Sequence, residues 1–301
     1  MQTAASPTVT CSEFALALGE AQYGNFKPAH TWLLLEYDGR WEPEAIPDSA
    51  LPAPVKEHLG AFLAAHPQSR ALLIRQQPRL VRGGPRFFVV RATPPYRQHG
   101  FALSRYEDLL DLDLDAIAAG DRAFDTALHS DPLLLVCTHG RRDRCCARHG
   151  VPVYERLAAL AGAGVWQSSH VGGHRFAANV LIFPQGLVYG RVSADTATAL
   201  YDAYQRGELL LDHYRARVAY PQPAQAAECY LRQRTDQMAL TAFDLEAVEQ
   251  GPDGVWAVSF GARDGARLTV TVREQAGPLT LSSCGDPQLS PSLHYALVNI
   301  T

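Results

Sequence analysis

The chain has 301 residues, of which 47% are hydrophobic and 19% charged, and its formal net charge is −4. This length allows two or three compact units, and the composition is that of an ordinary soluble globular protein. The acidic balance gives no reason to expect nucleic acid as a partner, because a basic footprint is missing. No apolar run is long enough to cross a bilayer, and the opening MQTAASPTVTCSEF lacks the charged start and apolar stretch of a signal peptide. We therefore expect a cytoplasmic protein without membrane contact, in a compartment where thiols stay reduced.

The N-terminal part of the chain predicts an α/β unit. Strand and helix patterns follow in the order strand, helix, three strands, helix, over residues 31–37, 53–66, 70–76, 86–92, 101–104 and 106–120. Its segment RGGPRFFVV echoes the segment GGHRFAANV in the middle of the chain. We interpret residues 1–125 as an N-terminal α/β domain and as a degenerate, duplicated copy of the unit that follows.

The middle of the chain gives the clearest pattern. It predicts a strand, a helix, a second strand, a β-hairpin and a second helix, over residues 132–136, 151–164, 165–169, 178–192 and 193–207. The last helix opens on Ser193 as its N-cap. This β-α-β-β-β-α order matches the thioredoxin fold, so we predict a thioredoxin-like domain over residues 130–215.

The C-terminal part predicts a small α+β unit over residues 222–301. A helix pattern in AQAAECYLRQRTDQM is followed by four β runs, DLEAVEQ, VWAVSFG, RLTVTVRE and HYALVNI. Turn signals rich in glycine and aspartate separate the first three runs.

Two short segments concentrate the cysteines and histidines. VCTHGRRDRCCARHG, residues 136–150, holds Cys137, Cys145 and Cys146 among four arginines. SSHVGGHRF places His170 and His174 on either side of Val-Gly-Gly, which indicates a tight loop rather than a helix. Each segment follows a predicted strand of the central unit. Loops at the carboxyl ends of such strands can meet, and ligands bind there in α/β sheets.

Four kinds of site compete for these residues. A redox-active disulfide favours Cys-x-x-Cys at a helix start, which is not the spacing found here. A nucleophilic thiol would gain from the arginines but leaves the paired histidines unexplained. Two cysteines and two histidines complete a zinc tetrahedron, although eight residues separate Cys137 from Cys146 where zinc sites usually have two to four. An iron–sulfur cluster is a larger object that a wider thiolate loop can wrap.

The segments resemble the sucrase/ferredoxin-like family of thioredoxin-like ferredoxins. The resemblance is carried by CTHGRRDRCCA, SHVGGHRFAANVLIFPQGLVYGRV, YPQPAQAAE and the closing SSCGDP and HYALV. It implies a thioredoxin-like [2Fe–2S] ferredoxin domain in which a widely spaced cysteine pair is combined with a His-x-x-x-His pair. Carried over by position, the resemblance implies that the cluster ligands are Cys137, Cys146, His170 and His174.

The function implied by the resemblance is electron transfer. Two thiolates on one iron and two imidazoles on the other form a Rieske-like distribution, which raises the reduction potential and allows proton uptake to be coupled to electron uptake. We expect a redox partner protein, either a reductase or an electron acceptor, and no intrinsic substrate turnover. The alternative is a structural zinc-binding interaction protein with the same four ligands, and a thiol oxidoreductase using Cys145 or Cys146 is a third class.

The remaining cysteines, histidines and arginines have plainer interpretations. We expect Cys145 to be a buried thiol beside the site, because neighbouring residues rarely both reach one small cluster. His139 and His149 are interpreted as hydrogen-bonding loop residues, and Arg175 as either an anchor of the histidine loop or a partner contact. Three scattered cysteines are interpreted as buried small hydrophobes: Cys11, Cys229 and Cys284.

Overall fold

The computed structural model describes residues 9–77 and 83–301. Within these ranges the strands are β1 (Thr31–Glu36), β2 (Ser69–Arg75), β3 (Arg86–Arg91), β4 (Arg97–Ala102), β5 (Leu133–Cys137), β6 (Val165–Ser168), β7 (Val180–Phe183), β8 (Leu187–Tyr189), β9 (Tyr214–Arg217), β10 (Phe243–Gln250), β11 (Val255–Ala262), β12 (Arg267–Ser283) and β13 (Asp286–Ile300). The α-helices are α1 (Cys11–Ala17), α2 (Ala53–Ala65), α3 (Leu114–Ala119), α4 (Arg144–Ala161), α5 (Ala194–Gln205) and α6 (Gln222–Thr235). Short 3₁₀ turns are η1 (Tyr106–Asp111), η2 (Arg122–Ala127), η3 (Gly162–Gly164), η4 (His174–Phe176) and η5 (Leu211–His213).

One nine-stranded sheet contains the same strand arrangement twice, in the order β4-β3-β1-β2-β6-β5-β7-β8-β9. In each half the first strand pairs in parallel with the second and antiparallel with the third, as β5 does with β6 and β7. The halves join where β2 pairs antiparallel with β6. This is the strand order of the thioredoxin fold, so the predicted fold class, with a duplicated α/β unit before the thioredoxin-like one, is confirmed. The domain boundaries at residues 125, 130, 215 and 222 stay predictions.

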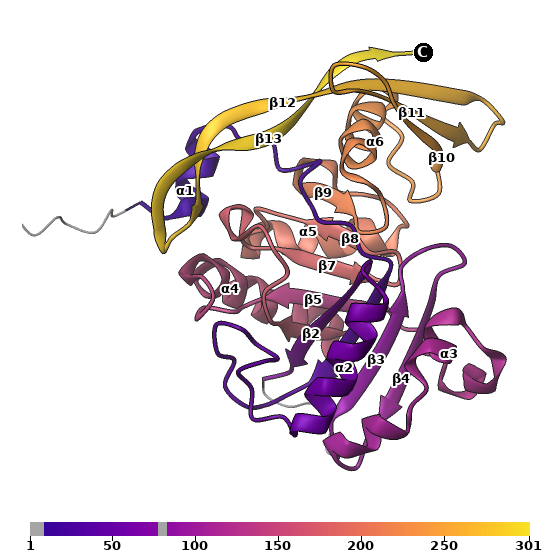
Figure 1. The fold of residues 1–301 in the computed structure, drawn as a ribbon. Coiled ribbons are helices and arrows are strands. Elements are labelled where there is room, and N and C mark those ends of the chain that lie inside the picture. The colour runs from indigo at the N-terminus through magenta and orange to yellow at the C-terminus, as the bar shows by residue number, and fades with distance from the viewer. Residues whose placement is uncertain (1–8, 78–82) are drawn as a thin grey trace, which may run out of the picture.

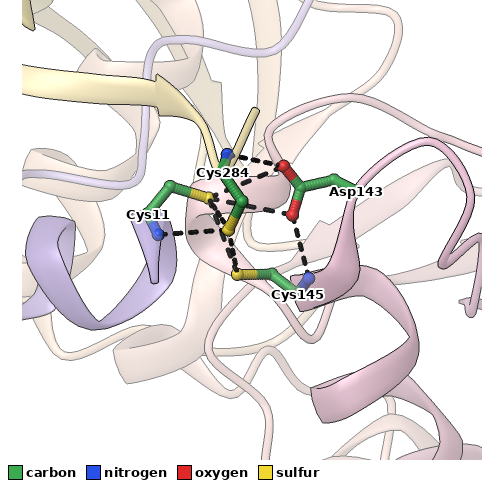
Figure 2. A group of neighbouring side chains, drawn as sticks. All are labelled: Cys11, Asp143, Cys145 and Cys284. Atoms are coloured by element: carbon green, nitrogen blue, oxygen red, sulfur yellow. Dashed lines mark hydrogen bonds between the residues drawn. The ribbon is translucent and has the colours of Figure 1, made fainter. Parts of the chain in front are cut away.

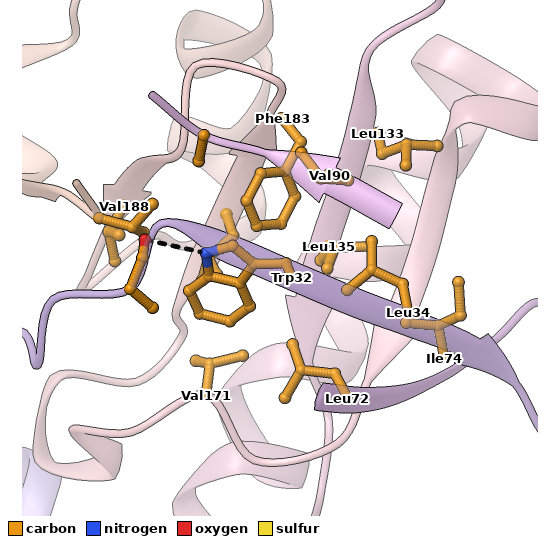
Figure 3. Packing of buried hydrophobic residues seen from close by; sticks show 14 of the residues in the cluster. Trp32, Leu34, Leu72, Ile74, Val90, Leu133, Leu135, Val171, Phe183 and Val188 are labelled. Carbon is orange, nitrogen blue, oxygen red and sulfur yellow. Dashed lines mark hydrogen bonds between the residues drawn. The ribbon is translucent and has the colours of Figure 1, made fainter. Parts of the chain in front are cut away.

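The sheet curls, and the residues on its inner side form a core between the two halves (Figures 1 and 3). Trp32 of β1 lies at its centre, fully buried, and packs on Phe183 of β7 with ring centroids 5.3 Å apart. Phe88 of β3 meets Trp166 of β6 edge to face at 5.8 Å. Fully burying an aromatic or large aliphatic side chain contributes about 1.5–3 kcal/mol, so this shared core fixes the two halves against each other.

Helices cover the outer side of each half. The apolar residues of α2, η1 and α3 pack on β1, β2 and β3 in one cluster, and those of α4 and α5 pack on β5, β6 and β7 in another. The helix predicted over 106–120 is broken into η1 and α3, because Asp113 caps a new helix by accepting a hydrogen bond from the Ala116 N–H. Within residues 9–77 and 83–301, no helix combines the length and apolarity that a bilayer crossing needs.

The C-terminal unit is a four-stranded antiparallel sheet, β10-β11-β12-β13, with α6 packed on it. Beneath α6 the Glu228 carboxylate is fully buried and accepts hydrogen bonds from Arg217 and Arg232, at 3.1 and 2.9 Å. Burial acts to raise the pKa of Glu228, but the two guanidinium groups hold it below its usual range.

Strands β12 and β13 are far longer than the sequence predicts. The expected runs, 267–274 and 294–300, continue into a hairpin whose strands end at Ser283 and restart at Asp286. Figure 1 shows this yellow hairpin leaving the C-terminal sheet and reaching the indigo helix α1. Gly277 and Pro278 interrupt the alternating strand pattern in the sequence, at the point where the register shifts between Ala276 and Leu279.

Candidate metal centre

Helix α4 carries two adjacent cysteines in its first turn. The sequence predicts a helix from residue 151, but α4 begins at Arg144, because the Asp143 carboxylate caps it by accepting the Cys145 N–H at 2.8 Å. Successive residues of an α-helix point about 100° apart. Cys145 and Cys146 therefore face different neighbours, and both are fully buried.

Cys146 faces the first of two groups of potential ligands. Its thiol, the Cys137 thiol at the end of β5 and a ring nitrogen of His170 all lie within 4.8 Å of one another. The Cys146 Sγ is 3.7 Å from the His170 Nδ1. The two loops that follow β5 and β6 thus meet at the carboxyl ends of these parallel strands, as predicted for this sheet.

His174, the fourth predicted ligand, lies beside this group and outside it. Its ring is tilted against that of His170 with centroids 5.0 Å apart. The Nε2 donates to the backbone oxygen of Ser282 at 2.5 Å, and the Nδ1 is buried with no hydrogen-bond partner. Burial lowers the pKa of His174, so the ring is neutral at pH 7 and its Nδ1 lone pair is free.

The histidine loop has its conformation because of two glycines and a buried arginine. Gly172 and Gly173 have φ of +100° and +69°, a region that side chains rarely adopt. Arg215, fully buried on β9, fills the space behind Gly173 and donates to the oxygens of Asn179 and Asn25 at 2.5 and 2.9 Å. The anchor of this loop is therefore Arg215, which the sequence analysis missed.

Arg175, the residue predicted as an anchor or a partner contact, is a second anchor of the loop: it pairs with the buried Glu20, with Nε 2.8 Å from Oε1. Glu20 also accepts from the Thr280 hydroxyl on β12 at 3.0 Å. The pair ties the histidine loop to the N-terminal segment and to the long hairpin.

His139 is a buried hydrogen-bonding residue of the cysteine loop, as predicted. Its Nε2 donates to the backbone oxygen of Glu42 at 2.9 Å, and its Nδ1 accepts the backbone N–H of His170 at 3.2 Å. Both ring nitrogens are thus engaged, which leaves neither for a metal. His149 was also expected in a loop, but it lies within α4.

The positive charges around the first group are mostly paired. Hydrogen bonds from the Cys146 thiol and from His170 lower the pKa of the Cys137 thiol. Arg70 is a nearby half-buried cation that lies 5.0 Å from the centroid of the Trp32 ring, and desolvation lowers its pKa to about 10. The exposed Arg141 and Arg142 of the cysteine loop pair with Glu42 and Glu44, and Arg148 of α4 pairs with Glu13.

Comparison with known proteins places this arrangement in a family. The model of the sucrase/ferredoxin-like family matches residues 22–216, well over half of the chain. The chain belongs to the sucrase/ferredoxin-like family.

A curated relative is altered inheritance of mitochondria protein 32 of Meyerozyma guilliermondii, 33% identical over 102 residues. The match covers 30% of this chain and 36% of the relative, so it spans about a third of that protein. Two cysteine-to-serine variants of the thioredoxin-like [2Fe–2S] ferredoxin from Aquifex aeolicus are 15% and 14% identical, with TM-scores of 0.26. Each match covers 28% of this chain and 97% of the ferredoxin.

This sucrase/ferredoxin-like chain also holds a second group, which the sequence analysis missed. The Cys11, Cys145 and Cys284 thiols and the Asp143 carboxylate lie within 4.8 Å of one another, and the four side chains point toward one another (Figure 2). Cys11 and Cys284 are therefore not the isolated small hydrophobes that we expected, and Cys284 is partly exposed. That prediction is confirmed for Cys229, which is buried and has its thiol pKa raised to about 12 by burial.

The charge of the second group is centred on Cys145 and Asp143. A hydrogen bond from the Cys11 thiol lowers the pKa of Cys145 to about 4, and its place in the first turn of α4 acts in the same direction. Burial acts to raise the pKa of Asp143, but the N–H groups of Cys284 and Cys145 hold it below its usual range. The Cys145 thiol and the Asp143 carboxyl are thus both anionic at neutral pH.

Proposed function

We propose that the chain is an electron-transfer protein that holds a [2Fe–2S] cluster through Cys137, Cys146, His170 and His174. The two thiolates would bind one iron and the two imidazoles the other. When bound, such a cluster supplies one-electron chemistry, at a potential that neutral imidazole ligands raise above that of an all-cysteine cluster.

The observation that carries the proposal is the position and hydrogen bonding of His174. Its unpartnered Nδ1 is buried, while its Nε2–H is held by a carbonyl oxygen. Histidines that bind metals have this arrangement, because the outer hydrogen bond fixes the tautomer and orients the ring. The chemistry of the four side chains also fits a [2Fe–2S] cluster. Cys137 and Cys146 supply two buried thiols, and His170 and His174 supply two imidazoles.

The distances favour a two-iron cluster over a single zinc ion. Two ligand atoms of one ion lie at most about 4.6 Å apart, because zinc–ligand bonds are about 2.0–2.3 Å long. Cys137, Cys146 and His170 satisfy that limit approximately, but His174 lies outside their group. A two-iron cluster spans a greater distance and can be bound by all four residues, whereas one zinc ion can be bound by three of them.

The surrounding residues have separate roles in this proposal. Arg70 places a half-buried positive charge near the Cys137 thiol, which stabilises added negative charge. His170 is the ligand that borders an open cavity of about 270 Å³, lined also by Arg70, Arg142 and His139. We propose this cavity as the side on which a redox partner protein exchanges electrons, because electron transfer needs a close approach and the thiols themselves are fully buried.

The test is the metal content and colour of the anaerobically purified 301-residue chain. We expect a red-brown protein with two irons and two acid-labile sulfides per chain, and an electron paramagnetic resonance signal that develops on one-electron reduction. Zinc has no redox chemistry and gives no colour. A colourless, folded protein whose Cys146→Ser variant loses one zinc per chain would refute the proposal and favour a structural zinc site at the same residues.

A further inference from the structure

The second group brings together three segments that are distant in the sequence. Cys11 opens α1, Cys145 lies in the first turn of α4, and Cys284 is at the tip of the β12–β13 hairpin. The sulfur–sulfur distances are 3.6 Å for Cys11–Cys145, 3.3 Å for Cys145–Cys284 and 3.5 Å for Cys284–Cys11. Both Asp143 oxygens are 3.9 Å from the Cys11 sulfur, so the carboxylate caps the triangle of thiols.

These separations are close to those around a tetrahedral metal ion. With zinc–sulfur bonds of about 2.3 Å, two thiolates of one tetrahedral site lie about 3.8 Å apart. The three sulfurs need to separate by only a few tenths of an ångström to accept such an ion. The fourth position is then filled by a carboxylate oxygen, which keeps the site closed to solvent, as in structural zinc sites.

The hydrogen bonds around the sulfurs support thiolates. The Cys284 sulfur accepts the backbone N–H of Cys11 at 3.4 Å. After the Cys11 thiol, the His149 side chain and the backbone of Ser12 also act to lower the pKa of the Cys145 thiol. Such outer donors orient metal ligands and reduce the cost of their negative charge.

A disulfide does not account for the whole group. It would join two of the three sulfurs at about 2.05 Å and leave the third thiol and the Asp143 carboxylate without a role. The ligand types also favour zinc over Cu⁺. Sites that bind Cu⁺ consist of thiolate and thioether ligands, whereas zinc binds thiolates together with a carboxylate.

We propose that Cys11, Cys145, Cys284 and Asp143 form a second, structural metal site that binds Zn²⁺. On binding, the thiols that are protonated release their protons to solvent, and no oxidation occurs. The ion joins α1 and the tip of the β12–β13 hairpin to the start of α4. This site shares no ligand with the one proposed for the cluster.

The zinc site would also hold the outer partner of His174 in place. Ser282, which accepts the His174 Nε2–H, is two residues from Cys284, and an Asp143 oxygen is 3.7 Å from the same Nε2. Zinc at the second group therefore fixes the hairpin tip over the histidine loop, at the expected position of the cluster.

The test compares the metal content of four forms of the 301-residue chain: wild type, Cys284→Ser, Cys146→Ser and the control Cys229→Ser. Cys229 is a buried cysteine that belongs to neither group. By native mass spectrometry and elemental analysis, we expect one zinc in wild type, Cys146→Ser and Cys229→Ser, and none in Cys284→Ser. Co²⁺ added to the zinc-free wild type should give the strong visible absorption of tetrahedral thiolate coordination, with affinity more than about 100-fold higher than for Cys284→Ser, since loss of an outer partner alone costs about 10–100-fold.

Hydrogen exchange gives a second readout. Removal of zinc by a chelator should speed amide exchange in the hairpin tip and in α1, while the central sheet is unaffected. The proposal is overturned if Cys284→Ser and Cys229→Ser hold equal zinc, or if wild type holds no zinc and its mass shows a disulfide within the group. Failure of the cluster proposal gives a different result, since iron would then be absent while the zinc that depends on Cys284 remains.

Discussion

Gly173→Ala is the substitution for which the structure gives the clearest magnitude. Gly173 lies in the histidine loop with φ of +69°, and an L-residue there costs about 1–2 kcal/mol. A Cβ would also lie 3.0 Å from the Cζ and Nη1 of Arg215, and closer still to its Nη2. Arg215 is buried and held by hydrogen bonds to Asn179 and Asn25, so its side chain cannot move aside without losing at least one of them.

A hydrogen bond that involves a charged group contributes about 1.5–3 kcal/mol, so we expect Gly173→Ala to lower the free energy of unfolding by about 3–5 kcal/mol in total. For a chain of this size that corresponds to a fall in Tm on the order of 10 °C. Thermal and urea denaturation of the full chain measure it. Because His174 follows directly, iron content should fall as well.

Gly60→Ala is the matched control. Gly60 is exposed in the middle of α2, with no atom within 4 Å of an added Cβ. Alanine is preferred to glycine at such a position, so this variant should gain up to about 1 kcal/mol. The two glycine-to-alanine variants should thus shift stability in opposite directions. If Gly173→Ala is as stable as Gly60→Ala, the role assigned to Arg215 behind the histidine loop is wrong.

Three further predictions concern the ligands and the buried carboxylate. Cys146→Ser should lose the visible spectrum and the iron, whereas Cys145→Ser should keep both, because its thiol faces the other group; equal loss in both would contradict this division. Replacing His170 and His174 together with cysteine should keep a cluster and lower its potential toward the roughly −400 mV of all-cysteine plant-type clusters, as measured by voltammetry, and an unchanged potential would exclude imidazole ligands. Glu228→Gln should lower the free energy of unfolding by about 3–5 kcal/mol, because two buried guanidinium groups lose their partner. The pKa of Glu228 is lowered in the folded state, so the stability that Glu228 contributes is complete above the unfolded pKa of about 4.3 and is lost as pH falls through the folded value. Urea denaturation at several pH values measures this, and midpoints that rise on acidification would contradict it.

The strands and the first group of potential ligands could be predicted from the sequence. Short apolar runs predicted β5 and β6, and glycines between the histidines predicted the tight loop that follows β6. Since parallel neighbouring strands end at one edge, two local motifs were enough to place Cys137 and His170 together. The start of α4 was missed because Asp143, its N-cap, lies eight residues before the expected helix, inside what was interpreted as a loop.

The second group could not be predicted from local pattern. Cys11 and Cys284 are 273 residues apart, and each stands alone in its own segment. They meet Cys145 only because the β12–β13 hairpin extends beyond its sheet, over a stretch in which Gly277 and Pro278 interrupt the alternation of a strand. The adjacent cysteines of α4 did indicate a second group. Two neighbouring residues on a helix point in different directions, so their side chains contact different partners.

The duplicated fold explains how the cysteine and histidine loops are supported. The N-terminal half has no cysteine at the end of β1, the position that corresponds to Cys137 at the end of β5. Its loop after β1 instead supplies the Glu42 oxygen that fixes the His139 ring, and that ring accepts the backbone N–H of His170. Arg70, on β2, donates to the Val171 oxygen at 2.9 Å within the histidine loop. One half thus carries the proposed ligands while the other holds the loops that present them, so substitutions in the N-terminal half act on the site through the positions of its loops.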